Sequence, residues 1–128
     1  MEIESKSNIE HNCKYHVVFC SKYRRKVLVN PVDQRLYELV SHKGEELGVG
    51  IELKVRPDHV DMIITCDPRI GVHRVVKQIK GYTSHHLRRE FKSLTSRLPT
   101  LWSNSYFVST VGEVSHEAVQ RYMETQKE

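Results

Sequence analysis

The sequence predicts a single α+β domain in which strands and helices follow the order β-α-β-β-α-β. Two observations carry this prediction. Four short segments alternate apolar and polar residues with a period of two, and two longer segments repeat apolar residues at helical spacing. At 128 residues the chain is long enough for one hydrophobic core and too short for two. The expected architecture is ferredoxin-like, or RRM-like, with a four-stranded antiparallel sheet and two helices on one of its faces.

The first strand is predicted over residues 14 to 20, where apolar side chains alternate at Tyr15, Val17 and Phe19. A basic run with one aromatic residue follows directly, Lys22-Tyr23-Arg24-Arg25-Lys26. In isolation such a run is most often a solvated loop. The alternative is a nucleic-acid contact, in which cations bind the phosphate backbone and the tyrosine stacks on a base. Its candidate binding residues are Lys22, Tyr23, Arg24 and Arg25.

A helix and a β-hairpin come next. Asn30 is predicted to cap the helix and Pro31 to occupy its first position, where the missing N–H costs nothing. The helix is expected to end at Gly48 or at the glycine two residues later. Residues 51 to 56 alternate apolar and charged side chains, and a Pro-Asp turn leads from them into a strand over residues 59 to 66. We expect these two strands to pair in an antiparallel fashion.

The strand over residues 59 to 66 places His59 and Asp61 on one face, because side chains alternate along a strand. An imidazole and a carboxylate two residues apart on one face can share a divalent ion or a phosphate oxygen. Such a pair is more often a solvated edge or a buried hydrogen-bonded pair when it stands alone. The motifs further along the chain favour the metal site.

A second helix is predicted over residues 70 to 94, with a buried apolar stripe at helical spacing. Its other positions carry six cations against one acid, Glu90, so partners for i,i+4 pairing are nearly absent. Charged outer faces are common on helices, but this excess of one sign indicates a nucleic-acid contact surface. The candidate binding residues are Arg74, Lys77, Lys80 and Arg88. Gly81 predicts either a kink or the close approach of a phosphate.

The C-terminal part completes the fold. Trp102 lies in a connecting segment and is predicted to be a buried anchor, and residues 106 to 111 alternate as the fourth strand. A last helix is expected within residues 113 to 128, over the sheet face that the other helices leave free. Tyr122 and Gln126 lie four residues apart on one side of it. Taken without its context, a tyrosine in such a terminal helix is packing in most proteins.

Composition narrows the class of protein. The net charge of +4 and the pI near 9.0 are compatible with an anionic partner. Three cysteines without paired or zinc-type spacing indicate a reducing compartment. No apolar run approaches membrane-spanning length, so we expect a cytoplasmic protein without a membrane partner. Residues 1 to 12 are expected to be loosely ordered, in a chain that is otherwise one domain over residues 1–128.

Seven short motifs stand in order along the chain: Lys14-Tyr15-His16-Val17-Val18, Lys22-Tyr23-Arg24-Arg25-Lys26-Val27, Pro57-Asp58-His59-Val60, Lys80-Gly81, Leu98-Pro99-Thr100-Leu101-Trp102, Ser109-Thr110-Val111-Gly112 and Tyr122-x-x-x-Gln126. In this order and spacing the chain resembles, over nearly its whole length, the small single-tyrosine HUH transposases of bacterial and archaeal insertion sequences. Members of that family move single-stranded DNA.

The resemblance implies a role for several residues. Tyr122 would be the nucleophile that attacks a scissile DNA phosphate, leaving a 5′-phosphotyrosine link and a free 3′-OH. His59 and Gln126 would hold Mg²⁺ or Mn²⁺, and Gly112 would serve as a hinge for the tyrosine helix. The resemblance also implies a homodimer that recognises DNA hairpins near the element ends, in which the tyrosine helix of one subunit can serve the metal site of the other.

One position departs from the family pattern of histidine, hydrophobic residue, histidine, because Asp61 stands in place of the second histidine. A carboxylate is a good ligand for Mg²⁺ or Mn²⁺, so we expect His59, Asp61 and Gln126 as the metal ligands. The added negative charge near the phosphate leaves open a weakened or inactive module that only binds DNA hairpins. A metal-dependent phosphodiesterase that activates water with His59 and Asp61, without a covalent intermediate, is a further alternative.

Overall fold

The computed structural model describes residues 13–112 and 116–127. The expectation of a loosely ordered segment over residues 1 to 12 lies outside the described residues. In chain order the elements are β1 (Cys13–Cys20), the short 3-10 helix η1 (Lys22–Arg24), α2 (Val32–Leu47), β2 (Gly50–Arg56), β3 (His59–Cys66), α3 (Val72–Glu90), α4 (Lys92–Arg97), β4 (Phe107–Thr110) and α5 (His116–Thr125).

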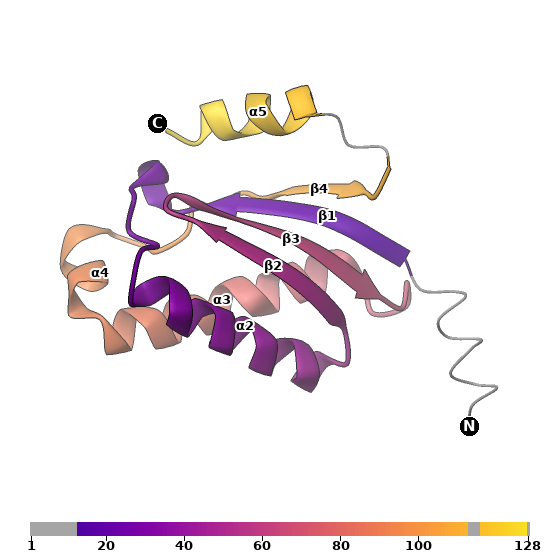
Figure 1. Ribbon diagram of the computed structural model, residues 1–128, viewed down its shortest axis with the longest axis horizontal. Helices are drawn as coiled ribbons and strands as arrows, with labels where there is room; N and C mark the ends of the chain where they lie inside the picture. The colour runs from indigo at the N-terminus through magenta and orange to yellow at the C-terminus, as the bar shows by residue number, and fades with distance from the viewer. Residues whose placement is uncertain (1–12, 113–115, 128) are drawn as a thin grey trace.

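The four strands form one antiparallel sheet in the order β2-β3-β1-β4. Helices α2 and α3 cover one face of this sheet, and α5 lies over the opposite face (Figure 1). In the central pair, Val18 of β1 lies opposite Asp61 of β3, and Cys20 lies opposite His59. The structure confirms the predicted ferredoxin-like α+β fold with its C-terminal helix.

The hydrophobic core lies between the sheet and helices α2 and α3. Strand β3 buries every second residue there, while the intervening residues are half-exposed. The strand contribution comes from Val17, Phe19, Val60, Met62, Ile64 and Cys66, and the helices add Leu36, Leu39, Val40, Val75, Val76 and Ile79. The period of two in the strands and the helical spacing of apolar residues therefore point at the same core, as the sequence predicts.

Trp102 is the predicted anchor, and the structure confirms it. Its side chain is 5% exposed, and its ring meets the edge of the Phe19 ring with centroids 4.7 Å apart. The indole N–H donates a hydrogen bond of 3.0 Å to the hydroxyl of Thr83 on α3. A buried indole that finds a hydrogen-bond partner ties the segment before β4 to the helical layer.

The second predicted helix is broken, so its expected extent to residue 94 is wrong. Helix α3 ends at Glu90, Phe91 adopts extended backbone angles, and α4 begins at Lys92. The Arg88 side chain donates to the Leu98 carbonyl at 3.1 Å, which stabilises the turned segment. The apolar residues keep their helical spacing across this junction. The sequence pattern therefore gives no sign that the helix changes direction there.

Smaller differences concern helix termini and one glycine. Helix α2 begins at Val32 rather than at Pro31, which takes the capping position without a side-chain hydrogen bond. Gly48 ends the helix in the left-handed region at φ 71°, as predicted. Helix α3 continues through Gly81, where an added Cβ would meet no atom within 4 Å, so packing does not explain the glycine.

Candidate functional site

Strand β3 presents His59 and Asp61 to the sheet face that α5 covers. The Nδ1 atom of His59 lies 2.7 Å from Oδ1 of Asp58, and these side chains are only 17% and 15% exposed. Because an ionised carboxylate can only accept, the Nδ1–H of His59 donates in this pair. The Nε2 atom of His59 has no hydrogen-bond partner among the residues described and is therefore available to a metal.

Asp58 is held in its ionised form. Burial by itself would raise the pKa of Asp58, but its hydrogen bonds with His59 and Arg24 together bring the pKa below its ordinary value. The sequence suggested Asp58 as a turn residue and as part of the Pro57-Asp58-His59-Val60 motif, with no role of its own at the site. Its role beside His59 follows from the hairpin between β2 and β3, which turns the carboxylate back onto the first residue of β3.

Asp61 has an unforeseen partner, His16 of the neighbouring strand β1. The Nε2 atom of His16 lies 2.5 Å from Oδ1 of Asp61. The other ring nitrogen of His16, Nδ1, is buried and has no hydrogen-bond partner in the described part of the chain. The alternation around Val17 could have indicated His16, because it places this histidine on the face opposite the core.

The chemistry of these side chains fits a divalent ion only in part. An imidazole nitrogen and a carboxylate oxygen are suitable donors for Mg²⁺ or Mn²⁺. Within residues 13–112 and 116–127, however, no three His, Cys, Asp or Glu side chains come together in a group that could hold a metal. A metal at His59 and Asp61 would therefore require a further ligand.

Gln126, the third expected ligand, is engaged elsewhere. Its Oε1 accepts a hydrogen bond of 3.2 Å from the hydroxyl of Ser105, and its Nε2 donates to Thr125. No hydrogen bond in the described part of the chain joins Gln126 to His59 or Asp61. The structure thus brings two of the three predicted metal ligands to one strand and holds the third at the end of α5.

Tyr122 lies half-buried on the inner side of α5. Its ring centroid is 5.9 Å from that of Phe107, and its helix packs against Val18 and Cys20 of β1. Its hydroxyl lies 3.2 Å from the hydroxyl of Ser105. Burial raises the pKa of Tyr122, and the hydrogen bond with Ser105 opposes this rise only partly. The phenol is therefore protonated at neutral pH in this position.

The hydrogen atoms around Ser105 can be assigned from the number of donors. Ser105 has one hydroxyl proton, which it donates to the amide oxygen of Gln126. While Ser105 donates to Gln126, Tyr122 donates its own proton to the Ser105 oxygen; the contact lowers the pKa of Tyr122 when Ser105 turns its proton to the phenol oxygen instead. Ser105, which the sequence did not single out, thus binds the candidate nucleophile and a candidate metal ligand at the same time.

Arg24 points into the protein. Its Nε and Nη2 atoms donate to Oδ2 of Asp58 at 3.0 and 2.9 Å, and its Nη1 donates to the carbonyl of Met123 on α5 at 3.2 Å. Tyr23 and Arg24 both have left-handed backbones, with φ of 58° and 53°. Such a conformation costs roughly 1–3 kcal/mol for a residue other than glycine. The strained turn directs the guanidinium at Asp58 and α5.

The rest of the basic run forms an exposed surface. Tyr23 and Arg25 are exposed and line a hollow of about 710 Å³ whose rim also includes Lys127. The ammonium of Lys22 lies 5.2 Å from the centroid of the Tyr23 ring. These residues are open to an anionic ligand, whereas the guanidinium of Arg24 is occupied. A DNA contact by any of the four stays a prediction.

The predicted binding residues of α3 divide in the same way. Arg74 and Lys77 are exposed and line a hollow of about 730 Å³ between α2 and α3. Lys80 instead donates to the carbonyls of Ser103 and Ser105 at 2.7 and 3.1 Å, and burial lowers the pKa of Lys80 to about 8. Arg88 is bound to backbone carbonyls of the α4 region, as described above. Arg74 and Lys77 are thus the cations of this group that remain free for a phosphate.

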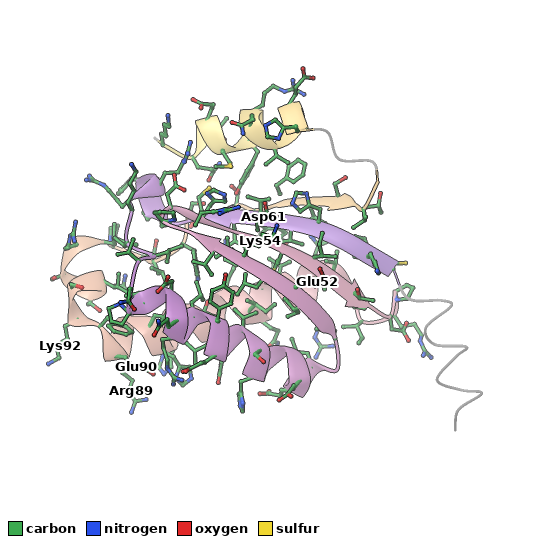
Figure 2. The ribbon with its side chains drawn as sticks, viewed as in Figure 1. Glu52, Lys54, Asp61, Arg89, Glu90 and Lys92 are labelled. Atoms are coloured by element: carbon green, nitrogen blue, oxygen red, sulfur yellow. The ribbon has the colours of Figure 1, made fainter. Side chains whose placement is uncertain are left out.

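Figure 2 shows labelled residues on the two sides of the sheet. Asp61 lies on the sheet below α5, and Lys54 and Glu52 lie along the neighbouring strand β2. Glu90, Arg89 and Lys92 lie at the junction of α3 and α4, in the helical layer on the other side of the sheet. The candidate metal ligands are therefore separated from the basic helix by the sheet itself.

Comparison with known proteins decides the family. The family described as "Transposase IS200 like" matches residues 9–126 of this chain. The chain belongs to the IS200-like transposases. This family membership makes the protein a DNA-processing enzyme by class, and it confirms the resemblance derived from the motifs.

Individual relatives agree with this assignment. This transposase is 29% identical to the ISDra2 transposase TnpA of Deinococcus radiodurans over 98% of its own length and 92% of the relative's. It is also 29% identical to the transposase for insertion sequence element IS200 of Salmonella typhimurium, over 98% and 84% of the two chains. A Deinococcus radiodurans crystal structure described as a transposase superposes with a TM-score of 0.82 at 30% identity, covering 90% and 91% of the chains.

A more distant structure shares the fold. The REP-associated tyrosine transposase bound to a REP hairpin superposes on this transposase with a TM-score of 0.60 at 14% identity, covering 89% of this chain and 64% of the other.

None of the helices described for the transposase is long and apolar enough to cross a membrane.

Proposed function

We propose that this transposase cleaves and rejoins single-stranded DNA at the ends of an insertion sequence, with Tyr122 as its nucleophile. The observation that carries the proposal is the position of α5, which packs on the sheet face that presents His59 and Asp61. A candidate nucleophile and two candidate metal ligands therefore belong to one surface of the sheet. Membership of the IS200-like family supports the same function.

The reaction consists of two steps, and in each step one ester bond at the phosphorus replaces another. The Tyr122 oxygen attacks the phosphorus while its proton passes to water, and the bond from phosphorus to the 3′ oxygen breaks. That oxygen takes a proton and leaves as a free 3′-OH, with the 5′ phosphate linked to tyrosine. In the rejoining step a 3′-OH attacks the phosphotyrosine and releases the phenol. The number of ester bonds is conserved, so strand transfer needs no ATP.

The residues of this chain prepare these steps. Tyr122 must first leave Ser105, because a phenol that donates a hydrogen bond and has a raised pKa is a poor nucleophile. His59, oriented by Asp58, and Asp61, held by His16, would bind Mg²⁺ or Mn²⁺ through Nε2 and a carboxylate oxygen. The ion would neutralise charge on the phosphate. Gln126 can join them only after it too leaves Ser105.

A homodimer offers one way to bring these groups together, and we include it in the proposal. Gly112 has φ 98°, in the left-handed region that favours glycine, in the turn that follows β4. A change of backbone direction at this position would let α5 of one subunit present Tyr122 and Gln126 to His59 and Asp61 of the other.

The proposed partner is single-stranded DNA that forms hairpins. The distant REP-associated transposase, whose fold this chain shares, was solved bound to a REP hairpin. In this chain the exposed cations Arg25, Arg74 and Lys77, with Tyr23 as an exposed ring, would bind phosphates and stack on a base.

The test uses labelled single-stranded DNA from the ends of the element, incubated with the full chain and Mg²⁺ or Mn²⁺ and separated on a denaturing gel. Label that moves with the protein, and is lost in Tyr122→Phe, supports the covalent mechanism. Cleavage without a protein adduct would instead favour the metal-dependent phosphodiesterase.

One observation favours a second candidate function, an inactive hairpin-binding module. His16 occupies a carboxylate oxygen of Asp61, and Ser105 occupies both Tyr122 and Gln126. DNA that is retained in a native gel but never cut or linked under either metal would support this candidate. Asp61→His, which restores the family's second histidine, is then the variant expected to recover cleavage.

A further inference from the structure

Arg24 connects the tyrosine helix with the histidine that is expected to hold the metal. One edge of its guanidinium donates twice to Oδ2 of Asp58, and the remaining nitrogen donates to the carbonyl of Met123, the residue after Tyr122. The other oxygen of Asp58 accepts from His59. An unbroken chain of hydrogen bonds therefore runs from α5 to His59.

Each contact in this chain has a physical consequence. With Oδ2 held by Arg24, the Asp58 carboxylate has a fixed plane, and its Oδ1 selects the His59 tautomer with hydrogen on Nδ1. That tautomer leaves the Nε2 lone pair for a metal. Carboxylates that orient a ligand histidine in this way commonly change metal affinity 10- to 100-fold when they are removed.

The contact with α5 is favourable for a different reason. The Met123 carbonyl belongs to the last turn of α5, where the helix dipole places partial negative charge, and it accepts both from the backbone N–H of Gln126 at 3.1 Å and from Arg24. A guanidinium there stabilises the docked helix. Arg24 and Asp58 are only 16% and 15% exposed, and what exposure they have is to the hollow that they line beside Tyr23 and Arg25.

We propose that Arg24 is a positioning residue that couples the docking of α5 to the orientation of His59. This inference rests on the proposed function and adds to it a link between nucleophile and metal ligand. When α5 is docked, Arg24 is shared between Met123 and Asp58. When α5 leaves, only Asp58 remains as its partner. A general phosphate contact is the competing role, because Arg24 lies in a basic run.

Arg25 provides a matched control. It is the next residue in the chain and carries the same charge, but it is exposed and its guanidinium takes part in no hydrogen bond or ion pair among the contacts described. A role that depends only on positive charge near DNA would give Arg24→Gln and Arg25→Gln the same effects. A positioning role would separate the two variants in measurements made without DNA.

Three measurements on the full chain without DNA test the proposal. The tautomer of His59 is read from its ¹⁵N shifts, the affinity for Mn²⁺ from the electron paramagnetic resonance of the free ion, and the docking of α5 from amide hydrogen exchange. In Arg24→Gln we expect a mixture of His59 tautomers, Mn²⁺ binding weaker by about tenfold, and faster exchange in α5. Arg25→Gln should match the wild type in all three.

Arg24→Lys keeps the charge and guards against a variant that fails to fold. Its single ammonium cannot reach Asp58 twice and Met123 once, so we expect intermediate values. If Arg24→Gln matches Arg25→Gln in tautomer and exchange, the coupling is refuted. Absence of a DNA adduct in the wild type would refute the proposed function alone, because tautomer and exchange still report on Arg24.

Discussion

The hydroxyl of Ser105 lies 3.2 Å from the hydroxyl of Tyr122 and 3.2 Å from the amide oxygen of Gln126. A single serine before β4 thus holds Tyr122 of α5 and Gln126, the residue directly after α5, both of which the proposed reaction needs. Each must exchange this partner before it can take part in the chemistry. The docked position of α5 is therefore a resting arrangement in the proposed mechanism.

Ser105→Ala is expected to accelerate adduct formation about fivefold, because a hydrogen bond worth about 1 kcal/mol no longer holds the phenol. The measurement is the initial rate of label transfer to the protein on a denaturing gel. Ser96→Ala is the control, since Ser96 is exposed on α4 and its hydroxyl donates to the Ser93 carbonyl of the same helix. A slower rate in Ser105→Ala would show that Ser105 assists the reaction instead.

Asp61→Asn is expected to weaken Mn²⁺ binding by about tenfold or more, because the amide keeps the shape of the ligand but loses its charge. Titration followed by electron paramagnetic resonance measures this directly. Glu52→Gln removes an equivalent charge from an exposed position on the same sheet face, and should leave the affinity unchanged (Figure 2). Equal losses in both variants would mean that Asp61 acts only through the overall charge.

The lowered pKa of Lys80 predicts that the free energy of unfolding rises with pH. Its pKa is lowered by burial to about 8 in the folded chain, against 10.5 when unfolded. Between these values the unfolded state binds more protons, so the free energy of unfolding increases as pH rises from about 8 to 10.5. Below about pH 8 the folded chain carries Lys80 in its charged form, which burial disfavours, so the free energy of unfolding is lower there.

Chemical denaturation of the wild type and Lys80→Met at pH 7.5 and 9.5 checks this sign. We expect the difference in unfolding free energy to shift in favour of the wild type at the higher pH. The variant itself should be destabilised at both values, since it loses the hydrogen bonds to the Ser103 and Ser105 carbonyls. A difference that does not change with pH contradicts the prediction.

Arg74 is expected to support DNA binding, and Arg88 is expected to support the stability of the fold. Arg74→Ala is expected to weaken DNA binding and to lower its salt dependence by about one ion, with little effect on unfolding. Arg88→Ala should destabilise the fold by about 1–3 kcal/mol, because the Leu98 carbonyl loses a charged donor. Gel shifts over a salt series and urea unfolding measure the two effects, and a reversed pattern would be decisive against the assignment.

Thr83→Val tests the anchor of the segment before β4. The substitution keeps the shape of the side chain but leaves the buried indole N–H of Trp102 without its acceptor. We expect a loss of about 1–3 kcal/mol in the free energy of unfolding by urea. Thr100→Val, at an exposed threonine that bonds to the Trp102 carbonyl, serves as the comparison and should cost less.

Local patterns predicted most of the fold. Period-two alternation identified the strands and placed His59 and Asp61 on one face, since side-chain direction in a strand depends only on position along it. Helical spacing placed the apolar stripes of α2 and α3 correctly. The break at Phe91 was missed, because apolar residues repeat at helical spacing through it while the chain changes direction.

By itself the sequence determined the order of elements, the faces of the strands and, through its motifs, the family. Only the tertiary structure decided which polar groups meet, because the partners are distant in the chain. Asp61 contacts His16, which lies 45 residues away in the sequence. Arg24 contacts Asp58 and Met123, which lie 34 and 99 residues away. Within a basic run, the sequence does not indicate whether a side chain faces solvent or a buried carboxylate. Packing, which strains the backbone at Arg24, makes that choice.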